Sequence, residues 1–156
     1  MRKLNPHYVE EVRAITNRCG FFRLMSMQMQ SLEIGRSVIE TEVGGQHLQP
    51  YGLAHGGVCS AIIDAAAWWA VFTELDEDMG MTTVDLNLNY LAPVTDGKII
   101  ARGRSIKLGR AIGLGAAEVT DQAGKLIAHG TSTVMVIPSV TFVGSGPSPG
   151  KFIDGE

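Results

Sequence analysis

The chain has few charged residues and almost no cysteine. Only 19% of its 156 residues are Asp, Glu, Lys or Arg, while 45% are hydrophobic, a composition that excludes a disordered chain. The 13 basic and 16 acidic side chains give a formal net charge of −3, so no overall positive field favours nucleic acid as a partner. Cys19 and Cys59 are too few for a disulfide framework or a cysteine-based zinc site. His7, His47 and His129 show no HxxxH or other spacing typical of metal ligands. We therefore expect no metal site.

An apolar segment of the kind found in signal peptides is also missing from the start of the chain, and we expect a cytoplasmic protein. The longest apolar run covers residues 56–72 and carries Asp64 at its middle. A run of this length is near the lower limit for a membrane span, and a charge at the bilayer centre is costly. The run therefore predicts a buried helix and no membrane span.

Hydrophobic periodicity predicts one helix that a sheet must cover. Asn5 and Pro6 have the residue types of a helix start, and a short helix follows that ends between residues 17 and 20. The helix of residues 56–72, extended to about residue 75, is apolar on nearly every side and must be wrapped. Alternating patterns predict the strands, which short breaks join as antiparallel hairpins: residues 21–32, 37–43, 81–91, 98–107, 111–121 and 125–137.

These elements form an α+β protein with one sheet layer around one helix. In the strand of residues 81–91, Val84, Leu86, Leu88 and Tyr90 are predicted to form the apolar face. We expect three segments in the chain: an N-terminal helix within residues 1–20, one domain over 21–138, and a flexible C-terminal tail over 139–156. The tail is rich in glycine, proline and serine and is either poorly ordered or a peripheral arm.

Asp64 is the residue that most needs an explanation. An ionised carboxylate among apolar neighbours is costly unless it is paired. It either lies at the helix surface, where it faces a loop or accepts from a backbone donor, or it lines a cleft as a base or nucleophile. At the start of the same helix, His55-Gly56-Gly57 leaves N–H groups without intrahelical partners. Such a helix start either receives a carbonyl oxygen or oxyanion, or serves as an entry turn with a packing role.

Residues 49–64 read QPYGLAHGGVCSAIID. This segment resembles the hotdog-fold acyl-CoA thioesterases, in particular the PaaI-like and 4-hydroxybenzoyl-CoA branches. Their signature is an amide residue, a Gly three residues later, HGG at the start of the central helix, and an acid nine residues past the His. Residues 84–93, 109–110 and 124–131 also look like this family, so the resemblance covers about residues 20–137. It implies the hotdog fold, in which an antiparallel sheet wraps around one long central helix.

The resemblance also implies roles for individual residues. Asp64 takes the position of the catalytic acid, and the backbone N–H of Gly56 that of the donor to the thioester oxygen. Gln49 would hold the nucleophilic water or the carbonyl, His55 would orient the helix start, and Thr83 would lie beside the water.

The chain mixes features of the two branches. Gln49 stands where many PaaI-like members carry Asn, and Gln occurs in a 4-hydroxybenzoyl-CoA branch. That branch has Glu at the acid position and Thr four residues later, where this chain has Asp64 and Trp68. Trp68, Trp69 and Phe72 either line an acyl or aryl pocket or pack in the core.

Gly56 and Asp64 are eight residues apart on one helix, which places them about 12 Å apart along its axis. One thioester cannot easily meet both groups from one chain. A two-fold homodimer solves this, because Gly56 and Gln49 of one subunit then face Asp64 and Thr83 of the other. The resemblance implies the same shared active sites, and we expect two such dimers to form a tetramer.

The substrate would bring CoA with it, and no other cofactor is expected. Arg104, Lys107, Gly109, Arg110 and Thr131 are candidates to bind the CoA phosphates, although a solvated strand face explains each of them equally well. The expected function is hydrolysis of an acyl-CoA or aryl-CoA thioester to the free acid and CoA. The alternatives are an acyl-thioester hydratase or dehydratase and a non-catalytic acyl-CoA-binding module.

Overall fold

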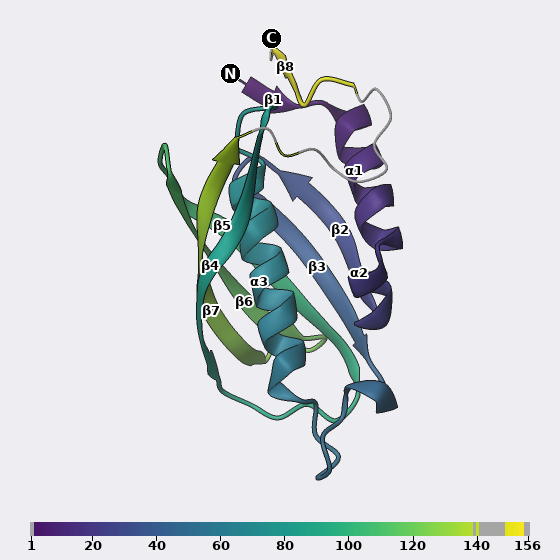
Figure 1. The fold of residues 1–156 in the computed structure, drawn as a ribbon. Coiled ribbons are helices and arrows are strands. Elements are labelled where there is room, and N and C mark those ends of the chain that lie inside the picture. Colours follow the sequence, from purple (N-terminus) through teal and green to yellow (C-terminus); the bar gives the residue numbers. More distant parts are fainter. Residues whose placement is uncertain (1, 139, 141–148, 155–156) are drawn as a thin grey trace.

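The computed structural model describes residues 2–138, 140 and 149–154. A six-stranded antiparallel sheet curves around one long helix, α3 (Gly56–Phe72) (Figure 1). The order of the strands across the sheet is β2 (Met27–Glu33), β3 (Arg36–Val43), β5 (Gly97–Leu108), β6 (Ile112–Asp121), β7 (Leu126–Pro138) and β4 (Met79–Tyr90). The expected fold class, an antiparallel sheet wrapped around a central helix, is confirmed.

Smaller elements lie around this unit. They are β1 (Arg2–Leu4), α1 (Pro6–Arg18), α2 (Gly20–Leu24), the 3-10 helix η1 (Gly45–His47) and β8 (Phe152–Asp154). The side chain of Asn5 caps α1 by accepting a hydrogen bond from the N–H of His7.

Small residues let α3 lie very close to the sheet. A Cβ atom on Gly103 would lie 2.1 Å from the carbonyl oxygen of Ala66, and one on Gly115 would lie 2.6 Å from that of Ala67. Only glycine fits at these two strand positions. The hydroxyl of Ser37 donates to the carbonyl oxygen of Ala66 at 2.6 Å and so ties the helix to β3. Around this contact the buried core is formed by Ile62, Ile63 and Val71 of α3 with Ile39, Ile99, Val119 and Val134 of the sheet.

A β-bulge interrupts β4 next to α3. Thr83 pairs with Val134 and Asp85 pairs with Thr133, so Val84 has no partner in the register and 53% of its surface is exposed. The helix-facing residues therefore change from 79, 81 and 83 to 86 and 88. The predicted apolar face is wrong at Val84, because a bulge shifts the alternation by one residue.

The N-terminal part differs from its prediction. Residues 20–24 form the short helix α2 instead of the start of a strand, and β2 begins only at Met27. The helical turn buries Phe22 while Phe21 and Leu24 remain exposed, an arrangement that an extended chain does not give. In β2 itself the methionine side, Met27 and Met29, faces the core.

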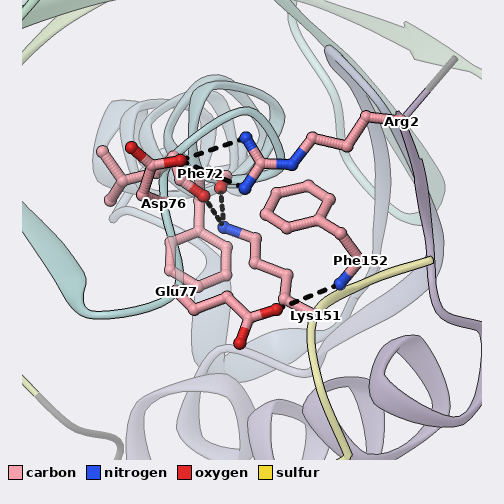
Figure 2. A network of polar contacts seen from close by, with 7 residues as sticks. Arg2, Phe72, Asp76, Glu77, Lys151 and Phe152 are labelled. Atoms are coloured by element: carbon pink, nitrogen blue, oxygen red, sulfur yellow. Dashed lines mark hydrogen bonds and ion pairs between the residues drawn. The ribbon is translucent and has the colours of Figure 1, made fainter. Parts of the chain in front are cut away.

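Residues 149–154 are not a flexible tail. β8 pairs with β1 in a second, two-stranded antiparallel sheet. The residue before β8, Lys151, is only 2% exposed, and its Nζ donates to the carbonyl oxygens of Phe72 and Leu75 at 2.5 and 2.6 Å (Figure 2). The expectation of a poorly ordered tail is wrong for these residues, because the carbonyl oxygens at the end of α3 need donors, and Lys151 supplies them. Residues 139, 141–148 and 155–156 of the predicted tail lie outside the described residues.

The neighbours of Lys151 complete this contact. Its Nζ lies 3.9 Å from the centre of the Phe72 ring. Arg2 forms an ion pair of 3.0 Å with Asp76 and lies over the ring of Phe152 (Figure 2). Burial, with a smaller contribution from Arg2, lowers the pKa of Lys151 to about 7.

In the part of the chain that the structure describes, no helix has the length and apolar character needed to cross a membrane.

Candidate active site

Two hydroxyl groups hold the carboxylate of Asp64. The Thr83 hydroxyl of β4 donates to Oδ1 of Asp64 at 2.9 Å, and the Ser132 hydroxyl of β7 donates to the same oxygen at 2.8 Å. The other oxygen, Oδ2, accepts no hydrogen bond from any residue that the structure describes. Among the described residues, both donors to Asp64 are side-chain hydroxyls. The structure therefore does not show the expected alternative of a bond from a backbone donor. The two hydroxyl bonds compensate the cost of the half-buried charge. They leave Oδ2 free to accept a proton or to attack a carbonyl carbon.

The half-buried Asp64 lies in the wall of a largely apolar pocket, which we call the Asp64 hollow. Its volume is about 410 Å³. Its apolar lining includes Phe21, Phe22, Met27, Trp68, Trp69 and Leu86. Trp68 stacks on Phe72 with 5.2 Å between ring centres and 9° between ring planes. Trp68 and Trp69 thus line this pocket, whereas Phe72 packs against both rings and does not line it.

His55 and the two glycines form the start of α3. Nδ1 of His55 accepts a hydrogen bond of 2.8 Å from the N–H of Gly57. The N–H of Gly56 has no acceptor among the described residues. Because the first N–H groups of a helix carry the positive end of its dipole, the Gly56 N–H is a donor available to an external oxygen.

Gln49, Gly56 and Tyr90 line a second pocket, the Gly56 hollow, with a volume of about 420 Å³. Oε1 of Gln49 accepts from the backbone N–H of Tyr51 at 2.5 Å, so the NH₂ group of Gln49 is the part that is left to donate. The hydroxyl of Tyr90 donates to the carbonyl oxygen of Gly56 at 3.2 Å. Tyr90 was not among the predicted site residues.

Within one chain, the predicted catalytic residues fall into two groups. Asp64 and Thr83 lie together, and Gln49 lies with Gly56, next to His55. Among the residues that the structure describes, none lines both the Asp64 hollow and the Gly56 hollow. Ser132 joins the first group although no motif marks it. Only the register of β7 against β4 could have identified it.

The candidate residues for the CoA phosphates are also divided. Arg104 and Thr131 line a pocket of about 320 Å³ together with Arg36, Arg102, Glu118 and His129. We call it the arginine hollow. It lies on the sheet face away from α3, since Gly103, between Arg102 and Arg104 in β5, faces the helix. Lys107, Gly109 and Arg110 do not line it. Lys107 is near the end of β5, and Gly109 and Arg110 lie in the turn to β6, where the N–H of Gly109 donates to the carbonyl of Ile112.

No group of three or more His, Cys, Asp or Glu side chains that could hold a metal ion occurs among residues 2–138, 140 and 149–154. The two free cysteines, Cys19 and Cys59, lie apart on the surface and in the core, respectively.

Comparisons with known proteins agree with this architecture. The sequence profile described as the Thioesterase superfamily matches residues 51–128. The chain is 26% identical over 117 residues to the 1,4-dihydroxy-2-naphthoyl-CoA hydrolase of Listeria monocytogenes, which covers 75% of this chain and 95% of that protein. It is 28% identical over 136 residues to human acyl-coenzyme A thioesterase 13, with 85% and 96% covered. The crystal structure of a thioesterase from Haemophilus influenzae superposes with a TM-score of 0.78 at 25% identity, covering 85% of this chain and 92% of that one.

The fold and these matches define a hotdog-fold thioester hydrolase. The chain belongs to the thioesterase superfamily, and its family-typical reaction is the hydrolysis of a thioester.

Proposed function

We propose that this protein hydrolyses acyl-CoA thioesters and that Asp64 is the acid of its active site. The observation that carries the proposal is the geometry of this carboxylate. Two hydroxyls hold Oδ1, while Oδ2 stays open beside an apolar hollow. This combination suits a substrate with an apolar acyl group and a reactive carbonyl at its end.

The free oxygen of Asp64 serves either of two routes. In the first, it takes a proton from water as the water oxygen bonds to the carbonyl carbon; the C–S bond then breaks, and the CoA thiolate receives the proton. In the second, the oxygen of Asp64 bonds to the carbonyl carbon and CoA leaves as thiolate. Water then hydrolyses the mixed anhydride and its proton passes to the thiolate. Both routes yield the free acid and CoA.

The carbonyl oxygen becomes negative in both routes and needs a donor. We assign this role to the N–H of Gly56 at the start of α3, supported by the NH₂ group of Gln49. His55 supports the assignment because it occupies the N–H of Gly57 and holds the helix start in place. Loss of one such donor typically raises a barrier by about 2.7–4 kcal/mol.

We propose that each active site is shared by two subunits. Gly56 and Asp64 line different hollows within one chain, so Gly56 of the partner subunit has to complete the site around Asp64. The twelve-residue strand β4 is at the edge of the sheet, and an edge this long favours pairing with a second copy. Exposed Val84, Tyr90 and Leu91 add apolar surface there. The tetramer implied by the resemblance stays a prediction.

The acyl group would occupy the Asp64 hollow. Its aromatic lining accepts an aryl ring or an alkyl chain, and Trp68, one helical turn beyond Asp64, is the aromatic lining residue nearest to it in sequence. The CoA phosphates would bind to arginine side chains, with Arg104 and Thr131 in the arginine hollow or Lys107, Gly109 and Arg110 at the turn as the two candidate places. No cofactor beyond the CoA of the substrate is required. Free thiols at Cys19 and Cys59 agree with a cytoplasmic reaction.

A thiol-release assay with short-, medium-, long-chain and aryl-CoA thioesters tests this proposal. Release of CoA from at least one class supports it. Hydration of crotonyl-CoA without release of CoA would identify a hydratase instead. Binding of acyl-CoA with neither reaction over several hours would identify a binding module.

A further inference from the structure

Ser132 is a buried hydroxyl with one specific partner. Ser132 is only 1% exposed. Its hydroxyl donates to Oδ1 of Asp64, which is 68 residues away in the sequence. No other side chain that the structure describes donates to this oxygen except Thr83. The two donors come from neighbouring strands, β7 and β4.

A β-bulge in β4 and a glycine in β6 bring the three residues together. Ser132 pairs with Leu86 of β4, just beyond the bulge, whereas Thr83 lies just before it. The bulge therefore turns the side chains of Thr83 and Leu86 toward the same face. On its other side Ser132 pairs with Gly115 of β6. Because Gly115 has no side chain, α3 can approach the sheet here, where a Cβ would lie 2.6 Å from the carbonyl oxygen of Ala67.

A carboxylate has two equivalent oxygens and can rotate about its last bond. One hydrogen bond to Oδ1 leaves part of this freedom, whereas two donors from different strands fix both the oxygen and the plane of the group. The oxygen that remains, Oδ2, then has a defined position beside the Asp64 hollow. A group that transfers a proton or attacks a carbonyl must be held in such a position.

We propose that Ser132 is a positioning residue that, together with Thr83, holds Oδ1 of Asp64 and so reserves Oδ2 for the reaction. This inference rests on the proposed function of Asp64. Ser132 touches neither water nor substrate in this role; it acts through Asp64. It contributes to the orientation of the carboxylate during turnover and not to binding of the acyl-CoA, so its removal affects kcat and leaves KM nearly unchanged.

The test compares Ser132→Ala with Thr133→Ala, a control at the next residue of the same strand, whose side chain has the opposite direction. We expect Ser132→Ala to lower kcat about ten- to a hundredfold, the loss that follows from one missing hydrogen bond to a charged group, with KM within about twofold. Thr133→Ala is expected to keep kcat within about threefold. Both are measured per mole of folded protein, using circular dichroism and gel filtration.

Two further variants separate positioning from a structural role. Ser132→Cys keeps the shape of the side chain with a somewhat larger atom and has only a weak donor, so we expect an intermediate kcat, measured on folded protein. In the Asp64→Asn background, Ser132→Ala is expected to cause no further loss of kcat, because the group that it positions is gone.

The outcomes also separate this inference from the proposed function. If Asp64→Asn is inactive while Ser132→Ala and Ser132→Cys both retain wild-type kcat, the positioning role is overturned and the proposed function stands. If the losses from Ser132→Ala and Asp64→Asn simply add, Ser132 acts independently of Asp64 and the inference is likewise wrong. If Asp64→Asn retains full activity, both proposals fail.

Discussion

The aromatic ring of Tyr90 covers the α-carbon of Gly56. A Cβ atom built on Gly56 would lie 2.9 Å from both Cζ and the hydroxyl oxygen of Tyr90. The same hydroxyl donates to the carbonyl oxygen of Gly56. A side chain at residue 56 would thus have to displace the end of Tyr90, a strand residue 34 positions away, from the start of α3.

Gly56→Ala is expected to lower kcat/KM by at least about tenfold, or about 1.4 kcal/mol. The methyl group displaces Tyr90 and crowds the N–H that we assign to the carbonyl oxygen. Gly45→Ala is the matched control, since a Cβ on Gly45 would meet nothing within 4 Å. Steady-state kinetics of both variants checks this. Full activity of Gly56→Ala would show that no substrate approaches this backbone closely.

Trp68→Ala is expected to change acyl-group preference. The indole lines the Asp64 hollow and stacks on Phe72, so its removal lengthens the pocket toward that ring. We expect the ratio of kcat/KM for long or bulky acyl groups to that for short ones to rise about tenfold, since one or two methylenes in an apolar pocket have effects of this size. Trp68→Phe serves as the control that keeps a ring. An unchanged ratio over the acyl-CoA series would place the acyl group elsewhere.

The stability of the protein is expected to depend on the protonation of Lys151. Burial lowers its pKa to about 7 in the folded state, whereas lysine in an unfolded chain has a pKa of about 10.4. Between these values the unfolded chain binds one proton more than the folded chain, so the free energy of unfolding rises with pH in this window. Below about pH 7 both states are protonated, and the cost of the buried charge stays constant.

Urea denaturation of the wild type and of Lys151→Met at pH 6, 7, 8 and 9 checks this dependence. The difference in unfolding free energy between wild type and variant is expected to move in favour of the wild type above about pH 7, by at most about 1.4 kcal/mol per pH unit. A difference that stays constant over the whole range would contradict a lowered pKa for Lys151.

Mixed dimers test the sharing of sites between subunits. A heterodimer of Asp64→Asn with Gly56→Ala contains one site with both changes and one site with neither, provided that the two groups come from different subunits. Random mixing makes half of the dimers heterodimers, so about a quarter of wild-type activity should return from two weakly active variants. If each chain supplies its own Gly56 and Asp64, mixing and reassembly restore nothing beyond the average of the two variants.

Much of the architecture is predictable from the sequence, because it follows from local patterns. The apolar run around Asp64 defines α3, and short breaks between alternating segments define the antiparallel sheet. Ser132 and Tyr90 are different, since their roles depend on strand register and on the bulge at Val84, which no local pattern reveals. Likewise, nothing in the sequence around Lys151 indicates that this residue, just before β8, donates to the carbonyl oxygens at the end of α3.

The central claim is that the carboxylate of Asp64 carries the reaction, and Asp64→Asn tests it most directly. An asparagine with its side-chain oxygen in the place of Oδ1 still accepts from Thr83 and Ser132, so we expect the variant to keep its fold and its oligomeric state. The charge and the proton acceptor are lost, and kcat for CoA release is expected to fall by at least about a hundredfold. A kcat/KM equal to that of the wild type on every acyl-CoA tested would contradict this account.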